Sequence, residues 1–110
     1  MKDHHGCPVQ ATMNVMSGKW KVQILWGLSF GPMRFATIRK KLKTISEKVL
    51  TDQLRQLEKD GVVRRQVSGS VPPAVTYSLN GEGEKLVPMM VLLCDWACAH
   101  FKMKPNLPRR

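Results

Sequence analysis

A cluster of positively charged side chains occupies the middle of the sequence. Between Arg34 and Gln66 there are ten Lys and Arg residues against four Asp and Glu residues, so this stretch carries +6 of the net charge of +10. Lys and Arg side chains bind phosphate oxygens and the acceptor edge of guanine, which favours a nucleic acid as the partner. A solvated helix face has the same composition, so the positions of these residues on their helices have to decide between the two interpretations.

Three cysteines are the other residues whose chemistry could matter. Cys7 directly precedes Pro8 and a predicted helix, whose positive end would stabilise a thiolate, so Cys7 is a candidate sensor of oxidants or a structural capping residue. Cys94 and Cys98 lie four residues apart and share one face of a predicted helix. Within a packed interface this pair is expected to act as small apolar residues and not as a redox pair.

The sequence contains no convincing pattern for an enzyme or a metal protein. His4, His5 and Cys7 are ligand types, but three such residues on an N-terminal tail do not define a metal site. His100 has no nucleophile or acid at a useful spacing. We therefore predict no catalytic residue, no metal and no cofactor.

The composition predicts one folded domain over residues 1–110, with flexible tails at 1–6 and 105–110. Of the 110 residues 43% are hydrophobic, including three Trp and seven Met, which is enough for a core. The longest nearly apolar run, Leu86 to Cys94, is shorter than the ~20 residues of a membrane-spanning helix. Because the start of the sequence has no export signal and the cysteines are odd in number, we expect a cytoplasmic protein with no membrane partner.

Four helices are predicted before residue 62. The first begins at Pro8 and is closed by Gly18, and the others cover residues 19–30, 35–42 and 46–60.

The register of the fourth helix decides which of its side chains face outward. Ser46 is its expected N-cap, and Leu50, Leu54 and Leu57 share one face, which must point to the core. The opposite face then carries Lys48, Thr51, Asp52, Arg55 and Lys59.

The second part of the chain predicts a hairpin and a long helix. Residues 63–67 and 75–79 alternate apolar and polar side chains around a turn with two prolines, which is typical of a two-stranded β-hairpin. A final helix is predicted from near Asn80 to about Met103, with a kink at Pro88. The large aromatic residues are expected to belong to the core: Trp20, Trp26, Phe35 and Tyr77.

The final helix is more apolar than one small domain can easily cover, which predicts a second subunit against it. We expect a homodimer through the first and last helices, formed by Val9, Met13, Met89, Leu92, Leu93, Trp96 and Phe101.

The order of these elements indicates the fold class. Two helices joined by a tight turn and followed by a hairpin are typical of a winged helix-turn-helix, in which the second helix of the pair enters the major groove. The expected fold is therefore mostly α-helical with a small β-hairpin wing, and the basic stretch coincides with the recognition helix, 46–60. We expect DNA contacts from Arg34, Arg39, Lys40, Ser46, Lys48, Thr51, Asp52 and Arg55.

Several ordered segments resemble the HxlR-type winged helix-turn-helix transcriptional regulators. They are Cys7-Pro8, Ser17–Trp20, Gly31–Phe35, Ile45-Ser46, Leu50-Thr51, Leu54, Leu57–Val63, Val71–Pro73 and Tyr77–Leu79. The resemblance runs from about Cys7 to Trp96. It implies a bacterial or archaeal cytoplasmic regulator, dimeric through its first and last helices, that binds a double-stranded DNA operator with two-fold character.

The resemblance also implies roles for individual residues. Ser46, Lys48, Thr51 and Arg55 match the DNA-facing surface of the family's recognition helix. Some members of the family sense oxidants or electrophiles with a cysteine at the position of Cys7, and others carry it with no known sensing role.

Two positions depart from the family pattern. Ala74 follows the paired prolines of the wing, where members often carry a basic residue, and the tip Ser68–Ser70 is uncharged, so deep insertion of the wing into the minor groove is not expected. Asp52 stands where an amide is common. Because phosphates repel a carboxylate, we expect Asp52 to pair with Lys48 or Arg55; the alternative is that it accepts a hydrogen bond from cytosine.

Two functions are compatible with the sequence. The first is a dimeric, sequence-specific transcription regulator whose recognition helices respond to a small effector or to thiol modification. The second is a basic winged-helix module that binds a protein or a structured RNA without reading a DNA sequence. Only the first predicts a persistent affinity ratio between an operator duplex and a random duplex, typically ~10³ or more.

Overall fold

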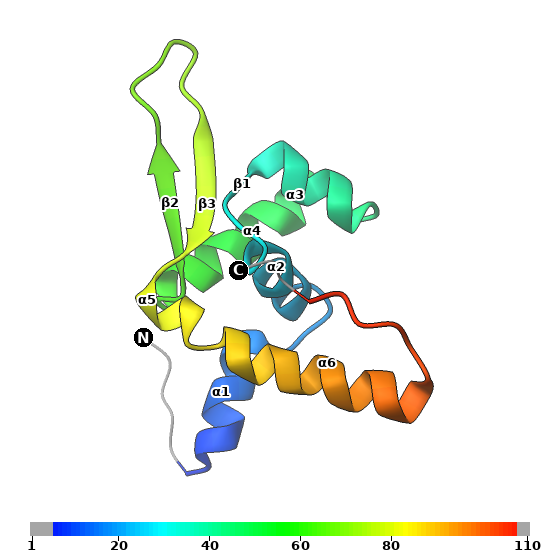
Figure 1. The fold of residues 1–110 in the computed structure, drawn as a ribbon. Coiled ribbons are helices and arrows are strands. Elements are labelled where there is room, and N and C mark those ends of the chain that lie inside the picture. The colour runs from blue at the N-terminus through cyan, green and yellow to red at the C-terminus, as the bar shows by residue number, and fades with distance from the viewer. Residues whose placement is uncertain (1–5, 108–110) are drawn as a thin grey trace.

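The computed structural model describes residues 6–107 of the chain; His4 and His5 lie outside the described residues, as do residues 108–110. The described part contains helices and strands in the order α1 (Pro8–Met16), α2 (Lys21–Leu28), β1 (Met33–Arg34), α3 (Phe35–Leu42), α4 (Glu47–Lys59), β2 (Val63–Val67), β3 (Val75–Leu79), α5 (Gly81–Glu84) and α6 (Val87–Phe101) (Figure 1). Helices α3 and α4 form the helix-turn-helix pair, and the β2–β3 hairpin is the wing. The predicted fold class is confirmed.

Helix α4 begins and ends where the local chemistry predicts. The Ser46 side chain accepts a hydrogen bond from the backbone N–H of Val49 at 3.1 Å, which satisfies one of the free amides of the first turn. After Asp60, Gly61 adopts a left-handed φ of 80°, which only glycine takes without strain. The boundaries of α4 therefore follow from its cap and its terminal glycine.

The wing belongs to a small antiparallel sheet with the strand order β1-β3-β2. The register pairs Val63 with Leu79 and Val67 with Val75, which confirms the predicted hairpin. Strand β1, which pairs Met33 with Tyr77, was not predicted. Two residues are too few to show an alternating pattern, so only the position of β3 beside them makes β1 a strand.

The core lies where α2, α3, α4 and the sheet meet. Ile24, Leu25 and Leu28 of α2 and Ile38 of α3 are almost completely buried, together with the leucines of α4. Tyr77 is buried as predicted. The other aromatic residues expected in the core pack against its edge and stay partly exposed: Trp20, Trp26 and Phe35.

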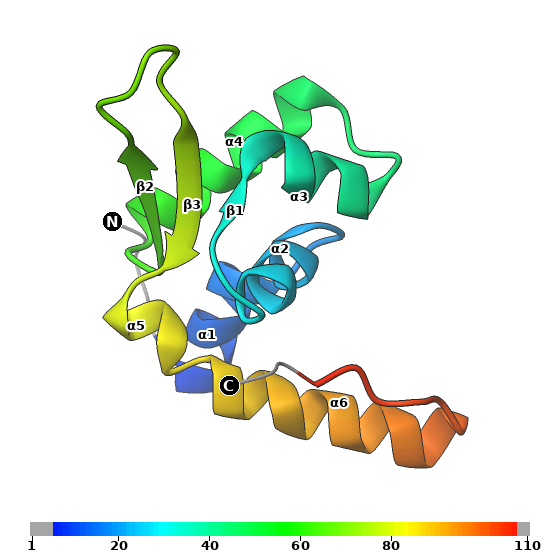
Figure 2. The ribbon, with the colours of Figure 1, turned by 45° about the horizontal axis from the view of Figure 1, so that its top comes forward.

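The prediction of one continuous final helix from near Asn80 to about Met103 is wrong. The structure has two helices, α5 and α6, separated by Lys85 and Leu86, and Pro88 lies in the first turn of α6 instead of kinking its middle. Proline has no N–H to donate to a carbonyl four residues earlier, but in a first turn that donor is not required. Figure 2 shows the chain changing direction between α5 and α6. Within residues 6–107, no helix combines the length and apolar character needed to cross a bilayer.

A close approach of two backbone segments fixes α5. A Cβ added to Gly83 would overlap the backbone carbonyl of Val62, whereas a Cβ added to Gly81 would meet open space. The Asn80 side chain caps this helix by accepting from the Gly83 N–H at 2.9 Å and also donates to the Gly61 carbonyl at 2.7 Å. The chain between the wing and α6 is thus held against the end of α4.

We predict that Gly83→Ala destabilises the protein by about 1 to 3 kcal/mol, because the new methyl group overlaps backbone that has no room to move. Urea unfolding followed by circular dichroism measures this loss. Gly81→Ala is the matched control and should leave the unfolding midpoint unchanged or slightly raised. Equal stability of the two variants would contradict the close approach.

Candidate nucleic-acid interface

Helix α4 presents a polar face to solvent because its opposite face is anchored in the core. Leu50, Leu54 and Leu57 are each 0% exposed. The exposed residues of α4 are Glu47, Lys48, Val49, Asp52, Arg55, Gln56 and Lys59. The outward placement predicted for the charged residues is therefore confirmed. Thr51 is only half-buried, and its hydroxyl donates to the Glu47 carbonyl at 2.9 Å.

The first turn of α4 offers donors to an anion. Ser46 is exposed, and its oxygen accepts from Val49, which leaves the hydroxyl hydrogen able to donate elsewhere. The neighbouring free amides and the positive end of the helix dipole favour a phosphate at this point. Glu47 lies in the same turn, and its negative charge opposes the binding of a phosphate there.

Arg39 joins α3 to α4. Its guanidinium lies 3.9 Å from the Glu47 carboxylate, and its Nε donates to the Ile45 carbonyl at 3.4 Å. An exposed ion pair of this kind contributes at most about 1 kcal/mol, but together with the hydrogen bond it orients the turn between the two helices. Lys40 and Lys41, next to Arg39, are exposed. Two of the predicted α3 residues, Arg39 and Lys40, therefore lie at the helix-turn-helix surface, and Arg39 already has partners there.

Arg34 belongs to strand β1 and is also the N-cap of α3. It pairs with Thr76 of β3, which in turn pairs with Gln66 of β2, so these three side chains share a face of the sheet. Buried Tyr77 points to the other face. The structure therefore brings the α4 residues together and leaves Arg34 beside the wing.

The expected ion pair of Asp52 is not formed. Among the described residues, the Asp52 carboxylate makes no salt bridge with Lys48 or Arg55, and all three side chains are exposed. Such pairs on a helix surface contribute only about 0.3 to 0.5 kcal/mol, so solvation competes with them easily. The carboxylate is left on the outward face, free to accept a hydrogen bond from a partner.

Val49 is a surface residue that the sequence reasoning missed. It is 37% exposed in the first turn of α4, although an apolar residue next to a buried leucine suggests the core. Helical periodicity could have predicted this exposure, because Val49 lies about 100° around the helix axis from Leu50 and therefore outside the leucine face.

The tip of the wing carries no charge. Residues 68–74 contain no Asp, Glu, Lys or Arg, and the tip is closed by two hydrogen bonds between Ser68 and Ala74, at 2.8 and 3.0 Å. The hairpin extends beyond the helices at one end of the molecule (Figure 1). That this wing does not insert deeply into the minor groove stays a prediction.

Helix α6 lies at the end of the molecule away from α3 and α4 (Figures 1 and 2), and several of its large apolar side chains are exposed. Trp96 is 61% exposed, and it stacks on His100 with ring centroids 4.7 Å apart. The other exposed apolar residues that the sequence assigned to a dimer interface are Val9, Met89, Leu92, Leu93 and Phe101, while Met13 is half-buried. We call the exposed residues of α6 in this set the α6 patch: Met89, Leu92, Leu93, Trp96 and Phe101.

The cysteines occupy two different environments. Cys7 is exposed at the N-cap of α1, with Pro8 in the first turn. Cys94 and Cys98 of α6 are partly buried, and their sulfurs lie 3.9 Å apart. Desolvation, the hydrogen bond with Cys94 and the nearby Cys94 and Asp95 raise the pKa of the Cys98 thiol, so this thiol is less readily ionised than an ordinary cysteine.

Comparison with known proteins identifies the family. Residues 15–105 match the profile described as HxlR-like helix-turn-helix. The chain belongs to this family. The HTH-type transcriptional regulator YdeP of Bacillus subtilis (strain 168) is 45% identical over 94 residues, which cover 86% of this chain and 73% of YdeP.

Two solved structures have the same fold. The transcriptional regulator YtcD matches with a TM-score of 0.84 and 39% identity, over 89% of this chain and 100% of the YtcD chain. The redox regulator HypR in its reduced form matches with a TM-score of 0.83 and 38% identity, over 86% of this chain and 94% of HypR. YtcD is described as a transcriptional regulator and HypR as a redox regulator, and this HxlR-like protein shares their fold.

Proposed function

We propose that this HxlR-like protein is a homodimeric, sequence-specific DNA-binding transcription regulator, whose two copies of α4 enter adjacent major grooves of an operator. The observation that carries the proposal is the register of α4. Three completely buried leucines on one face hold Lys48, Asp52 and Arg55 together on the other, where side chains of this length and polarity reach base edges.

The residues of α4 fit distinct parts of the duplex. Arg55 and Lys48 suit the O6 and N7 acceptors of guanine, and the unpaired Asp52 carboxylate suits the amino group of cytosine. Val49 suits the methyl group of thymine. Thr51 is a further proposed contact to the DNA.

The surrounding residues fit the DNA backbone. Ser46 and the free amides of the first turn favour a phosphate, and Arg39, Lys40 and Arg34 supply positive charge on either side of α4. Contacts of this kind fix the orientation of the protein on the duplex and make binding sensitive to salt.

The α6 patch supports a dimer. It is apolar, exposed and centred on Trp96, which is the composition of an interface core. Since each helix-turn-helix reads one half-site and half-sites lie about 34 to 36 Å apart, the dimer sets the distance between the two recognition helices.

Cys7 is the proposed thiol sensor. It is exposed and lies directly before the N-terminal end of α1. The related protein HypR is described as a redox regulator with oxidised and reduced forms. Cys7 lies at the start of α1, one of the two helices of the proposed dimer interface. Modification of its thiol would change how the two subunits pack and so the distance between the two recognition helices.

Binding to DNA from the region upstream of the protein's own gene, compared with random duplex across a salt series, tests the proposed function. Fluorescence anisotropy should give an affinity ratio of about 10³ or more that persists as salt rises. Equal affinities that fall together with salt would contradict it and favour a basic module that binds a protein or an RNA.

In the same assay Arg55→Ala should weaken operator binding by about 1 to 3 kcal/mol, roughly 5- to 150-fold, because a base-edge contact is lost. Lys85→Ala removes the same charge from the C-cap of α5, where the ammonium pairs with Glu82 at 2.9 Å, and should change the affinity far less. If both variants lose the same small amount of operator affinity, only the net charge of the protein matters, and α4 is not the recognition helix.

Trp96→Glu should shift the protein to monomer, with a loss of at least about 2 kcal/mol or roughly 30-fold in dimer affinity, because it places a carboxylate within the α6 patch. Sedimentation velocity over a concentration series measures the dissociation constant. Trp96→Phe keeps an aromatic ring and should stay dimeric. A dimer undisturbed by the glutamate would place the interface elsewhere.

Treatment with diamide, which oxidises thiols to disulfides, should change the operator affinity of the unmodified protein, and Cys7→Ser should abolish that change. The Cys94→Ser/Cys98→Ser variant controls for the other thiols and should keep the response. A response that follows Cys94 and Cys98 instead would reject Cys7 as the sensor.

A further inference from the structure

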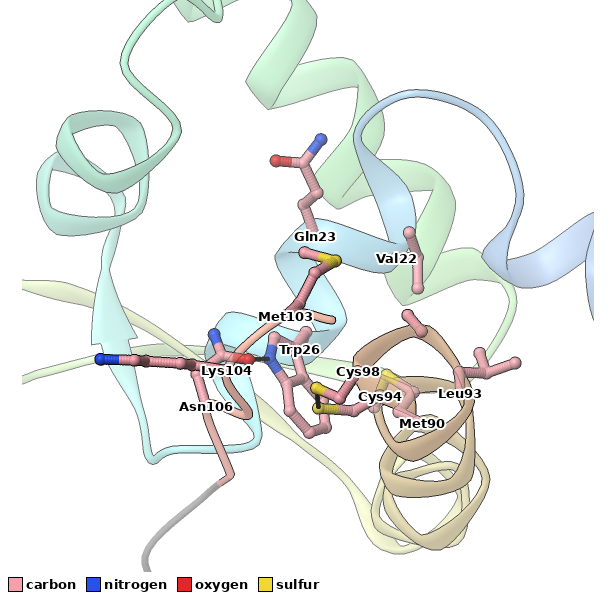
Figure 3. Close-up of a pocket in the computed structure, with 11 residues that line it drawn as sticks. Val22, Gln23, Trp26, Met90, Leu93, Cys94, Cys98, Met103, Lys104 and Asn106 are labelled. Atoms are coloured by element: carbon pink, nitrogen blue, oxygen red, sulfur yellow. Dashed lines mark hydrogen bonds between the residues drawn. The ribbon is translucent and has the colours of Figure 1, made fainter. Parts of the chain in front are cut away.

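An apolar pocket lies between α2, α6 and the segment that follows α6. Its volume is about 270 Å³. Figure 3 shows Trp26 of α2 on one side and Cys94 and Cys98 of α6 on another, with Met103 and Lys104 closing it from the C-terminal segment.

The fold of the C-terminal segment creates this pocket. Lys102 adopts the left-handed conformation, with φ 58° and ψ 44°, and turns the chain back from the end of α6 toward α2 (Figure 1). The Trp26 indole N–H then donates to the Asn106 side chain at 3.2 Å. The sequence predicts a frayed tail from residue 105, but a polar contact 80 residues away in the chain has no signal in local sequence.

Four sulfur-bearing side chains line the pocket: Met90, Cys94, Cys98 and Met103. Three of them come from α6 at intervals of four residues, so they share the helix face that is turned toward α2. Met103 comes from the returning segment. Leu93 of the α6 patch also lines the pocket, whereas Leu92 and Trp96 do not.

The distance between the two thiols suits a shared metal ion. The Cys94 and Cys98 sulfurs lie 3.9 Å apart. Two thiolates bound to one tetrahedral ion at ~2.3 Å are ~3.8 Å apart, so both sulfurs reach a common ion with little movement. A disulfide would require them to approach to ~2.05 Å.

The donor set selects the kind of metal. Thiolate and thioether ligands favour Cu(I), whereas zinc sites are completed by further Cys, His or carboxylate ligands. Among the described residues, no group of three or more His, Cys, Asp or Glu side chains is placed to hold a metal ion. The other sulfur donors that line the same pocket are the thioethers of Met90 and Met103, which only a soft ion uses well.

We propose that Cys94 and Cys98, assisted by Met90 and Met103, form a binding site for a soft monovalent metal ion, Cu(I). On binding, each thiol loses its proton to solvent and its sulfur forms a bond to the metal, with no change in oxidation state. The two thiolates and one Cu(I) carry a net charge of −1.

Competition for Cu(I) against the chromophoric chelator bicinchoninate, with reduced full-length protein under argon, tests the site. The protein should remove one Cu(I) per chain from the chelator. Cys94→Ser/Cys98→Ser should weaken this by about 100-fold or more, and Met103→Leu by about 10-fold. Cys7→Ser is the matched thiol control and should bind Cu(I) as the unmodified protein does.

X-ray absorption at the copper edge identifies the donors and should show sulfur alone. Failure of the unmodified protein to take Cu(I), unchanged binding by the double serine variant with native circular dichroism, or nitrogen and oxygen donors would each overturn the proposal. Stoichiometric displacement of Cu(I) by an equal concentration of Zn²⁺ would also overturn it, because the site would then not be selective for a soft ion.

Discussion

Burial of three leucines on α4 is the constraint on which the functional surface depends. Leu50, Leu54 and Leu57 are completely inaccessible to solvent, and each contributes about 1.5 to 3 kcal/mol by leaving water. Rotating α4 about its axis would expose this face, so the helix has one orientation available. That orientation sends Lys48 and Arg55 outward, which means that the position of the proposed base-reading side chains is set by apolar packing and not by their own weak electrostatic interactions.

Helix α6 contributes to two features. Met90, Cys94 and Cys98 line a pocket closed by α2 and by the chain's own C-terminal segment. Other side chains of the same helix form the exposed α6 patch, and Leu93 belongs to both the patch and the pocket. A second subunit on the patch would therefore reach the edge of the pocket at Leu93.

Much of the fold and part of the candidate site were predictable because they depend on local rules. Caps, glycine stops and apolar periodicity predict α1 to α4, and the alternation of residues 63–67 and 75–79 predicts the wing. The side chains of α4 followed from its leucine register. Strand β1 and the separation of α5 from α6 were missed, because a two-residue strand needs its neighbour and because Pro88 fits a first turn as well as a kink.

The sequence by itself determined the helix-turn-helix, its basic outward face and the family, since these depend on spacing within single elements and on ordered motifs. Only the tertiary structure decided that Asp52 is not paired with Lys48 or Arg55, that Arg39 lies beside Glu47, and that Cys94 and Cys98 line a pocket. The pocket depends on contacts between distant segments, above all the Trp26 to Asn106 hydrogen bond, and the Arg39–Glu47 pair depends on how α3 and α4 pack. Helical periodicity shows which residues share a face but not what lies opposite, and it does not show that solvation outcompetes the weak pairs expected for Asp52.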